Sequence, residues 1–370
     1  MNLKYEKEDI YSSLNEKELK DVDNYCDNYL EFLNKGKTEY LCVKEAKKML
    51  SSEGFIEIQK VQKLKAGDKV FFVNKDKSLF VSIIGKDSLV NGVNIIGAHI
   101  DSPRIDIKPM PLYENHDIAL LKTQYYGGIK KYQWMSIPLA MYGVVYTQKQ
   151  EKIEIAIGDD KNDPCFTMAD LLPHLAKDQM KANANEFIDP EKMSVIIGNL
   201  KDKDKDLKKD SVKMAVLKIL NQKYGIKEID FARSEISFVP AFIAKYVGID
   251  KSMIGGYGQD DRVCSYATIK AICDISKDTN QINKTIFAVI VDKEEIGSVG
   301  NTSMESKTFD MFVNKIIKKT GEENVDLMEL FYNSKMLSAD VATAVDPVYD
   351  EVSDIQNSNI MGCRNSTRKI

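Results

Sequence analysis

The chain has 370 residues, of which 43% are hydrophobic and 29% are charged, and its formal net charge is −4. This length can bury a large core and predicts a soluble globular protein with two or more domains. The small negative charge argues against a nucleic-acid partner held by general electrostatics. No apolar run approaches the roughly 18 residues of a membrane helix, and the charged N-terminus lacks a signal-peptide core, so we expect no membrane partner.

The first hundred residues mix helical and strand patterns. Residues 8–50 place apolar side chains at helical spacing, and Gly54 ends that pattern. Residues 69–74 and 78–84 surround a polar turn and predict a β-hairpin. Residues 92–99 form a short apolar run that predicts a buried strand, with His99 at its end.

The middle of the chain has a different texture. Residues 105–245 hold several short β-like runs separated by loops, one of which (201–210) alternates in charge and predicts a solvated turn. We therefore expect a β-rich domain to be inserted here. The runs are 105–107, 119–126, 144–147, 153–157, 193–197 and 235–240.

After residue 245 the α/β pattern returns. Apolar side chains at helical spacing predict helices over 262–276 and 308–319, and apolar runs predict strands over 285–291 and 334–337. The expected domains are accordingly a first part of an α/β domain, an inserted β-rich domain, and a second part of the α/β domain. Their boundaries are 1–104, 105–245 and 246–370.

The six cysteines lack the CxxC and zinc-ribbon spacings, which favours free thiols in a reducing cytoplasm. No histidine lies near Cys264 in the sequence, so a nucleophilic thiol is not favoured there. We therefore expect a cytoplasmic protein whose cysteines lie mostly in its core. They stand at positions 26, 42, 165, 264, 273 and 363.

Acidic side chains and one histidine follow three of the predicted strands. His99 and Asp101 follow the first, Glu294 and Glu295 the second, and Asp340 the third. Ligands of open α/β sheets gather beyond the carboxyl ends of the strands, so these side chains are expected to meet. Carboxylates with one imidazole suit a pair of divalent ions and hydrolysis by an activated water.

Each of these motifs has an ordinary explanation when it stands alone. A histidine two residues before an aspartate can cap a strand end, and Glu294-Glu295 can begin a helix or lie in a solvated loop. Asp260-Asp261-Arg262 can be a helix N-cap with an ion pair. Their combination, in this order and at strand ends, is what favours a catalytic site.

Roles follow from the chemistry that a two-metal hydrolase needs. Asp260 is the candidate bridge between two ions, and the remaining ligands are His99, Glu295 and Asp340. Glu294, beside Glu295 but pointing away, is the candidate general base that takes a proton from the attacking water. Asp101 would accept a hydrogen bond from the second imidazole nitrogen and fix its tautomer.

Seven stretches of the sequence resemble the M18 metalloaminopeptidases, the group of aspartyl aminopeptidase and aminopeptidase I. Together they are specific, and they extend from near the start of the chain to about residue 350. The stretches are IIGAHIDSPRIDIKP (95–109), YYGGIKKYQW (125–134), DLLPHLA (170–176), EISFVPAF (235–242), GQDDRVCSYA (258–267), VDKEEIGSVGNTSMES (291–306) and LSADVATAVDPVY (337–349).

The resemblance implies a zinc-peptidase α/β/α sandwich interrupted by a β-rich dimerisation domain, with dimers that build a dodecamer. It implies removal of N-terminal residues from peptides, acidic in some members and neutral or apolar in others. It also implies two divalent ions per subunit, zinc first and manganese or cobalt as alternatives. The matched motifs give the same metal ligands, general base and histidine partner as above.

The resemblance assigns a further role to His174, in the DLLPHLA stretch. A histidine at this place in the family reaches into the neighbouring subunit's site and contacts substrate. The alternative is a structural histidine on a helix of the inserted domain.

The end of the chain departs from the family pattern, in which further strands and a Met-His-Ser-type motif supply a last metal histidine. Here residues 364–370 match nothing in the family, and no histidine follows His174. We therefore expect a C-terminal truncation, by frameshift, gene shortening or trimming, or else a genuine short variant. The expected consequences are an incomplete catalytic domain, an uncovered sheet edge, weaker zinc binding and little activity.

Two other functions compete with the aminopeptidase. A non-catalytic assembly subunit or decayed paralogue would keep the dimerisation domain, although the intact set of acids argues against long decay. A carboxypeptidase or deacylase on the same scaffold is disfavoured by the seven stretches. Candidate cations for an acid-preferring pocket are Arg104, Lys130 and Lys131, which the sequence does not place.

Overall fold

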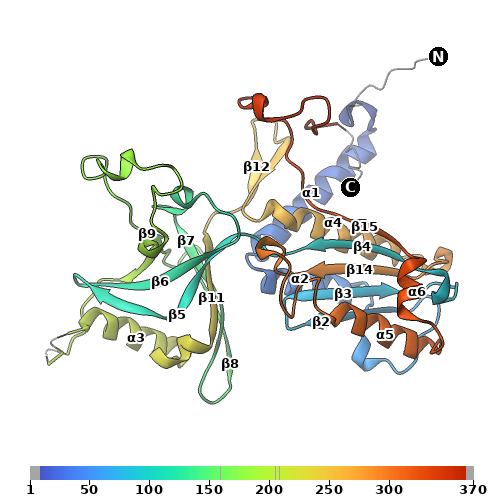
Figure 1. Ribbon diagram of the computed structural model, residues 1–370, viewed down its shortest axis with the longest axis horizontal. Helices are drawn as coiled ribbons and strands as arrows, with labels where there is room; N and C mark the ends of the chain where they lie inside the picture. The colour runs from blue at the N-terminus through green and yellow to red at the C-terminus, as the bar shows by residue number, and fades with distance from the viewer. Residues whose placement is uncertain (1–8, 159, 205, 208, 364–370) are drawn as a thin grey trace.

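The computed structural model describes residues 9–363 apart from 159, 205 and 208, and its strands form two main sheets that lie side by side (Figure 1). Residues 1–8, where the expected helical region would begin, and the unmatched residues 364–370 lie outside the described residues. The chain builds most of the first sheet, crosses into the second after residue 99, and returns to the first after residue 240.

The first sheet has six strands in the order β1-β2-β3-β14-β4-β15. β4 pairs in parallel with both β14 and β15, whereas β3 is antiparallel to its two neighbours β2 and β14. The carboxyl ends of β4, β14 and β15 therefore meet at one edge. The bounds are β1 (Ile56–Glu57), β2 (Lys69–Asn74), β3 (Ser78–Ile83), β4 (Asn94–His99), β14 (Ile286–Val291) and β15 (Lys335–Ser338).

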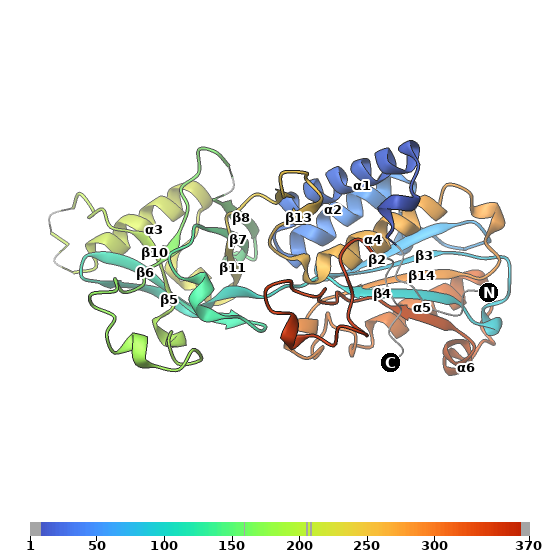
Figure 2. The ribbon, with the colours of Figure 1, turned by 90° about the horizontal axis from the view of Figure 1, so that it is seen from above.

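Helices cover both faces of this sheet, which gives the three-layer α/β/α arrangement (Figure 2). α1, α2 and α4 contribute to the core on one face, and α5 and α6 to the core on the other. The expected helices and strands of this part are confirmed, with boundaries shifted by a few residues. The helices are α1 (Glu16–Lys35), α2 (Glu39–Ser52), α4 (Gln259–Ile275), α5 (Thr308–Thr320) and α6 (Leu327–Tyr332).

Local sequence explains why these helices begin where they do. The side chain of Asn15 accepts hydrogen bonds from the backbone of residues 17 and 18, and Glu18 reciprocates to the backbone of Asn15, a capping box for α1. The Thr38 hydroxyl accepts a hydrogen bond from the backbone N–H of Leu41 and so caps α2. On α5, Phe309 and Phe312 are buried against the aromatic rings of the sheet.

The second sheet has seven strands in the order β8-β7-β11-β5-β6-β10-β9, and its pairings are antiparallel. A separate core lies between it and α3 (Ser211–Tyr224). A small hairpin of β12 (Lys245–Val247) and β13 (Met253–Gly255) leads back to the first sheet. The bounds are β5 (Arg104–Asn115), β6 (Ile118–Tyr126), β7 (Leu139–Tyr146), β8 (Lys152–Ile157), β9 (Thr167–Met168), β10 (Ser194–Gly198) and β11 (Ser234–Pro240).

The structure differs in two ways from what the sequence predicted for the middle of the chain. Helix α3 was not expected in this β-rich region, and its buried residues Val212 and Val216 cover one face of the second sheet. The helical alternative for His174 is wrong, because this residue lies in an exposed turn that follows β9.

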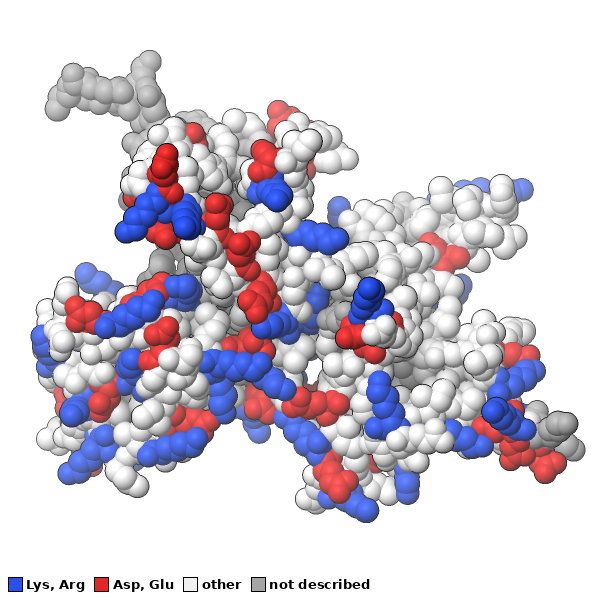
Figure 3. Space-filling model, turned by 180° about the vertical axis from the view of Figure 1, so that it is seen from behind, with Lys and Arg blue, Asp and Glu red and all other residues white. Residues whose placement is uncertain are grey.

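Charged side chains of both signs intermingle over the face of the molecule seen in Figure 3, in keeping with the small net charge. Among the residues that the structure describes, none of the helices combines the length and apolar character that crossing a bilayer requires.

Candidate metal centre

The candidate centre lies where β4, β14 and β15 end. The strand pairing sets His99 of β4 opposite Val291 of β14, three residues before Glu294. It also sets Ser338 of β15 opposite Gly97, so that the chain enters Asp340 at the same edge. The convergence expected from the sequence follows from this parallel register.

One imidazole nitrogen stands at the middle of the centre. His99 is only 4% exposed, and its Nε2 lies 3.2 Å from Asp260 Oδ1. The same nitrogen lies 3.7 Å from Glu294 Oε2 and 3.7 Å from Asp340 Oδ1. Ligand atoms of His99, Asp260 and Asp340 all lie within 4.8 Å of one another, a spacing that a single ion can span.

The donor set fits a divalent cation. Among the described residues, His99 Nε2 and Glu295 Oε1 are buried and have no hydrogen-bond partner. A buried polar atom without a partner is costly, so a ligand that pairs with it is expected. An imidazole with several carboxylates is a set that zinc, manganese and cobalt accept.

Asp101 links the imidazole to the turn that carries the glutamates. Its Oδ1 lies 3.3 Å from His99 Nδ1, on the side of the ring away from the other acids. The same carboxylate accepts hydrogen bonds from Tyr126 Oη at 2.7 Å and from the backbone N–H groups of Glu294 and Glu295, each at 3.2 Å. Asp101 is thus placed to orient both the histidine and the glutamate turn.

The charges of the centre shift the titration of its members. Burial alone would lower the pKa of His99, but contact with Asp101 and further acids raises it to about 9. Burial and repulsion from Asp260 raise the pKa of Glu295 to about 7. Burial likewise raises the pKa of Asp261 to about 7. These shifts mark a site where negative charge is crowded and where a cation is favoured.

The two glutamates lie in a short 3₁₀ turn, Glu294–Ile296, between Lys293 and Gly297, which both have positive φ. Glu294 turns its carboxylate toward His99, as a base beside the reacting water would require. Glu295 is close enough to Asp260 for their charges to interact, and its side chain approaches Gly127, which follows the end of β6.

The remaining candidates lie elsewhere. His174 is exposed and is not among the residues that the described structure gathers at the centre. Arg104 is buried in ion pairs with Glu39 and Asp106, so it does not offer a free cation to a substrate. Lys131 donates a hydrogen bond to the backbone carbonyl of Asn185.

Tyr126 is a residue of the centre that the sequence did not reveal. It ends β6 in the second sheet, and its hydroxyl reaches Asp101 from there. Burial, followed by the neighbouring Asp101 carboxylate, raises the pKa of Tyr126 well above its usual range, so the phenol remains a donor. A tyrosine directly before the Gly127-Gly128 pair at a strand end was the only available signal.

Comparison with known proteins places this geometry in a family. Residues 32–363 match the family described as aminopeptidase I zinc metalloprotease (M18). The chain belongs to the M18 family of zinc aminopeptidases. The resemblance drawn from the seven sequence stretches is therefore confirmed, and so are the enzyme class and the use of a divalent metal.

M18 relatives match over nearly the whole chain. A probable M18 family aminopeptidase 1 of Borrelia garinii is 43% identical over 360 residues, which are 96% of this chain and 78% of the relative. A probable M18 family aminopeptidase 1 of Clostridium acetobutylicum is 41% identical over 96% of this chain and 77% of its own.

The crystal structure of the M18 aminopeptidase of Thermotoga maritima has a TM-score of 0.90 and 40% identity, covering 97% of this chain and 77% of that one. The crystal structure of aminopeptidase I of Clostridium acetobutylicum has a TM-score of 0.89 and 39% identity, and the match covers 97% of this chain and 78% of that one. The predicted M18 fold is confirmed by these matches. These matches do not bear out the predicted C-terminal truncation.

Proposed function

We propose that this M18 chain removes the N-terminal residue of peptides with the help of two divalent ions. The observation that carries the proposal is the cluster of His99, Asp260 and Asp340, whose ligand atoms lie within 4.8 Å of one another at the strand ends. Glu294, 3.7 Å from the same imidazole nitrogen, adds a carboxylate beside the cluster.

The residues that would hold the ions are Asp260, as the bridge, with His99, Glu295 and Asp340 as the other ligands. Zinc is the first candidate, with manganese and cobalt as alternatives, because all three accept imidazole and carboxylate donors. When bound, such ions would supply Lewis-acid activation of the attacking water and the scissile carbonyl.

The chain's own groups would handle the proton and the orientation. Glu294 would take a proton from the attacking water and later deliver it to the amine that leaves. Asp101 would hold His99 in the tautomer that keeps Nε2 free, since its carboxylate lies against Nδ1. Both roles stand on the placement of these groups around His99.

The assembly and the domains belong to the same proposal. We infer an α/β domain from residues 1–104 and 246–370 and an inserted dimerisation domain at 105–245, supported by the second sheet, whose strands run from Arg104 to Pro240. The solved S. cerevisiae mApe1 dodecamer, 19% identical with a TM-score of 0.73, shares the fold.

We propose dimers that build a dodecamer, in which His174 would contact substrate of a neighbouring subunit. Support comes from the loop around His174, where Leu171, Leu172 and Leu175 are 54%, 65% and 71% exposed. Sedimentation of the chain as a monomer at assay concentration would contradict this. A cytoplasmic location fits the six cysteines, all of which are free thiols.

The decisive experiment is peptide hydrolysis by the purified chain with zinc, manganese or cobalt added in turn. We expect release of free amino acid from the N-terminus of Leu- or Asp-initiated peptides, which a chelator abolishes and added metal restores. The ratio of the two rates gives the preference for neutral or acidic residues. Release from the C-terminus instead would contradict the aminopeptidase proposal.

Glu294→Gln tests the general base. We expect kcat to fall by roughly 10²–10⁴-fold, with metal affinity close to that of the parent, because Glu294 handles the proton. Glu305→Gln is the matched control on the loop that follows, and it should leave kcat unchanged. Equal rates for Glu294→Gln and the parent would remove Glu294 from the mechanism.

A single imidazole has a consequence for turnover. Of the three histidines in the sequence, only His99 lies among the clustered ligands, so we propose weak zinc affinity and impaired activity at stoichiometric metal. Activity should then rise with metal concentration well beyond two equivalents. Full activity at two equivalents would contradict the impairment, while tight metal binding without any turnover would favour a non-catalytic assembly subunit.

A further inference from the structure

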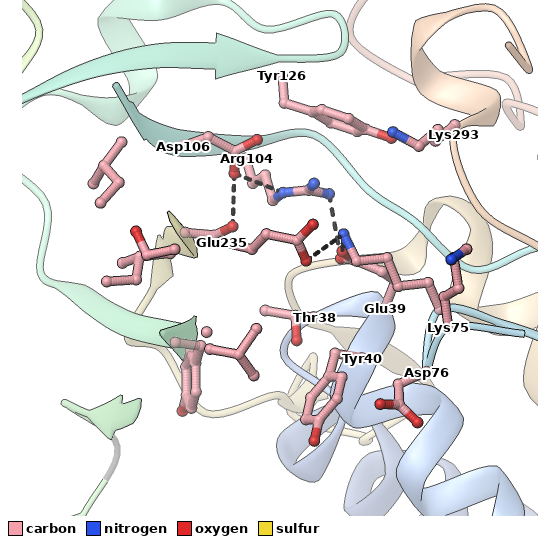
Figure 4. Close-up of a pocket in the computed structure, with 18 of the residues that line it drawn as sticks. Thr38, Glu39, Tyr40, Lys75, Asp76, Arg104, Asp106, Tyr126, Glu235 and Lys293 are labelled. Carbon is pink, nitrogen blue, oxygen red and sulfur yellow. Dashed lines mark hydrogen bonds and ion pairs between the residues drawn. The ribbon is translucent and has the colours of Figure 1, made fainter. Parts of the chain in front are cut away.

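A group of buried ion pairs lies between the two sheets, beside a cavity of about 360 Å³ (Figure 4). Its centre is Arg104 of β5, which is 7% exposed. The guanidinium lies 3.3 Å from Glu39 Oε2, at the start of α2, and 2.8 Å from Asp106 Oδ1. Arg104 therefore connects α2, which packs on the first sheet, to β5 of the second sheet.

Further contacts extend this group on both sides. Lys77, in the turn between β2 and β3, lies 3.5 Å from Glu39 and 3.0 Å from Glu235 of β11. The hydroxyl of Ser237 donates to Asp106 at 2.6 Å. Glu39 is thus shared by Arg104 and Lys77, and Asp106 accepts from both Arg104 and Ser237. Removing one partner of a buried charge is strongly destabilising.

A series of contacts also connects Arg104 to His99, the candidate metal ligand. Arg104 and Tyr126 stand opposite each other on β5 and β6, and the guanidinium carbon lies 3.8 Å from the centre of the Tyr126 ring. The Tyr126 hydroxyl donates to Asp101 at 2.7 Å, and Asp101 lies 3.3 Å from His99 Nδ1. Three consecutive contacts thus run from the ion pairs to the imidazole.

We propose that Tyr126 and Arg104 are positioning residues of the metal centre, which fix Asp101 and through it His99 from the side of the second sheet. The inference rests on the proposed metal function. Asp101 is fully buried, and the only side-chain hydroxyl that donates to it in the described structure is that of Tyr126. Without this donor, the carboxylate keeps only the two longer hydrogen bonds from the backbone of Glu294 and Glu295, and the partner of the imidazole is less firmly held.

The arrangement of the ring explains why both residues are needed. Tyr126 is 8% exposed, and the flat guanidinium of Arg104 covers one face of its ring, a contact that a lysine ammonium would make less well. The ion pairs with Glu39 and Asp106 hold that guanidinium in place. The junction between the two sheets thereby becomes part of what orients the metal ligand.

The test is metal affinity of the full chain, measured by titration with Co²⁺ and its visible absorption band. We expect Tyr126→Phe, which keeps the ring and its stacking, to bind Co²⁺ roughly 10–100-fold more weakly than the parent. Tyr125→Phe, on the neighbouring and 49% exposed tyrosine of the same strand, should bind as the parent does. Unchanged affinity in Tyr126→Phe overturns the inference.

A cycle with Asp101→Asn shows whether Tyr126 acts through the carboxylate. In the Asp101→Asn background, adding Tyr126→Phe should change Co²⁺ affinity less than twofold, because the carboxylate that the hydroxyl positions is gone. The same fold-loss in both backgrounds would mean that Tyr126 acts by another route and would overturn the proposed order of contacts.

Arg104 is tested by two substitutions. Arg104→Lys keeps the charge for Glu39 and Asp106, so the chain should fold, and we expect Co²⁺ affinity to fall by several-fold with an altered absorption band. Arg104→Met should reduce Co²⁺ affinity further. If this variant does not fold, the Co²⁺ affinity of Arg104→Lys alone tests the role of Arg104. Parent-like affinity and absorption in Arg104→Lys would confine Arg104 to stabilising the junction.

Activity gives a second readout. At saturating metal, Tyr126→Phe should lower kcat with KM unchanged, since Tyr126 is placed to act on Asp101 and not on substrate. A parent chain that binds no Co²⁺ would contradict the proposed function itself. A parent that binds Co²⁺ beside a Tyr126→Phe variant that binds it equally well would contradict the positioning role alone.

Discussion

At the scale of single residues, several acids lie around one buried histidine. The protonation of these groups depends on whether a metal ion is bound. His99 has its pKa raised to about 9, and Glu295 and Asp261 have theirs raised to about 7. Each group holds its proton more tightly in the folded chain than in the unfolded one. Folding without metal is therefore linked to proton uptake at this site.

The free energy of unfolding of the metal-free chain should consequently fall as pH rises. For His99 the stabilisation is complete below its ordinary pKa of 6.5 and is lost as pH approaches about 9. The stabilisation that protonated Glu295 contributes is lost as pH rises from its ordinary pKa of 4.5 to about 7. Thermal unfolding with chelator present should give a Tm that decreases from pH 5 to pH 9.

His99→Gln is the control for this pH dependence, and its Tm should decrease less between pH 6.5 and pH 9 than that of the parent. Saturating metal should flatten or reverse the trend, because metal binding needs the deprotonated ligands. A Tm of the metal-free parent that rises across this range would contradict the assignment of raised pKa values.

At the scale of elements, strand pairing places the candidate ligands, and helices pack against the strands. β4 lies between β14 and β15, and the pairing of β4 with both is parallel. On one face of the sheet, α5 packs aromatic rings of Phe309 and Phe312 against Phe80 and Phe287. This aromatic cluster holds α5 against β3 and β14, and β14 is the strand that leads to Glu294.

Phe312→Ala should reveal how much this cluster stabilises the fold. The side chain is fully buried, so we expect a loss of about 3–5 kcal/mol in the free energy of unfolding, measured with urea. The preceding residue offers a matched control, since Met311 is 38% exposed and Met311→Ala should change stability by less than about 0.5 kcal/mol. Similar losses in both would show that α5 does not pack as described.

At the scale of the whole molecule, the edge strand beside β4 is exposed in the described structure. β15 pairs with β4 on one side, and it is the last strand in the order. All four of its residues are exposed, including Met336 and Leu337, each at 54%. An exposed apolar edge strand is a template for pairing with another chain.

Leu337→Lys should therefore reduce concentration-dependent association, because a lysine on an edge strand opposes pairing. Light scattering over a range of concentrations would measure the effect. Ile219→Lys is a suitable comparison, since Ile219 is 61% exposed but lies on helix α3, which cannot extend a sheet. Equal effects of the two substitutions would attribute association to general hydrophobicity.

Much of the fold followed from the sequence, because local patterns specify it. Apolar runs bounded by polar turns gave the strands that end at His99 and before Glu294, and helical spacing gave α4 and α5. Parallel strands of one sheet end at the same edge, so their pattern also placed the acids together. Helix α3 was missed although its sequence is rich in apolar residues, which pack against the second sheet.

The sequence by itself determined the family and the acids that gather around His99, since these depend on short motifs and on strand ends. Only the tertiary structure decided that Glu294 faces His99, that Arg104 forms buried ion pairs, and that Tyr126 donates a hydrogen bond to Asp101. The last two contacts join the part of the chain around the first sheet to strands of the second sheet. No periodicity or spacing along the chain records which side chain of one sheet meets which side chain of the other.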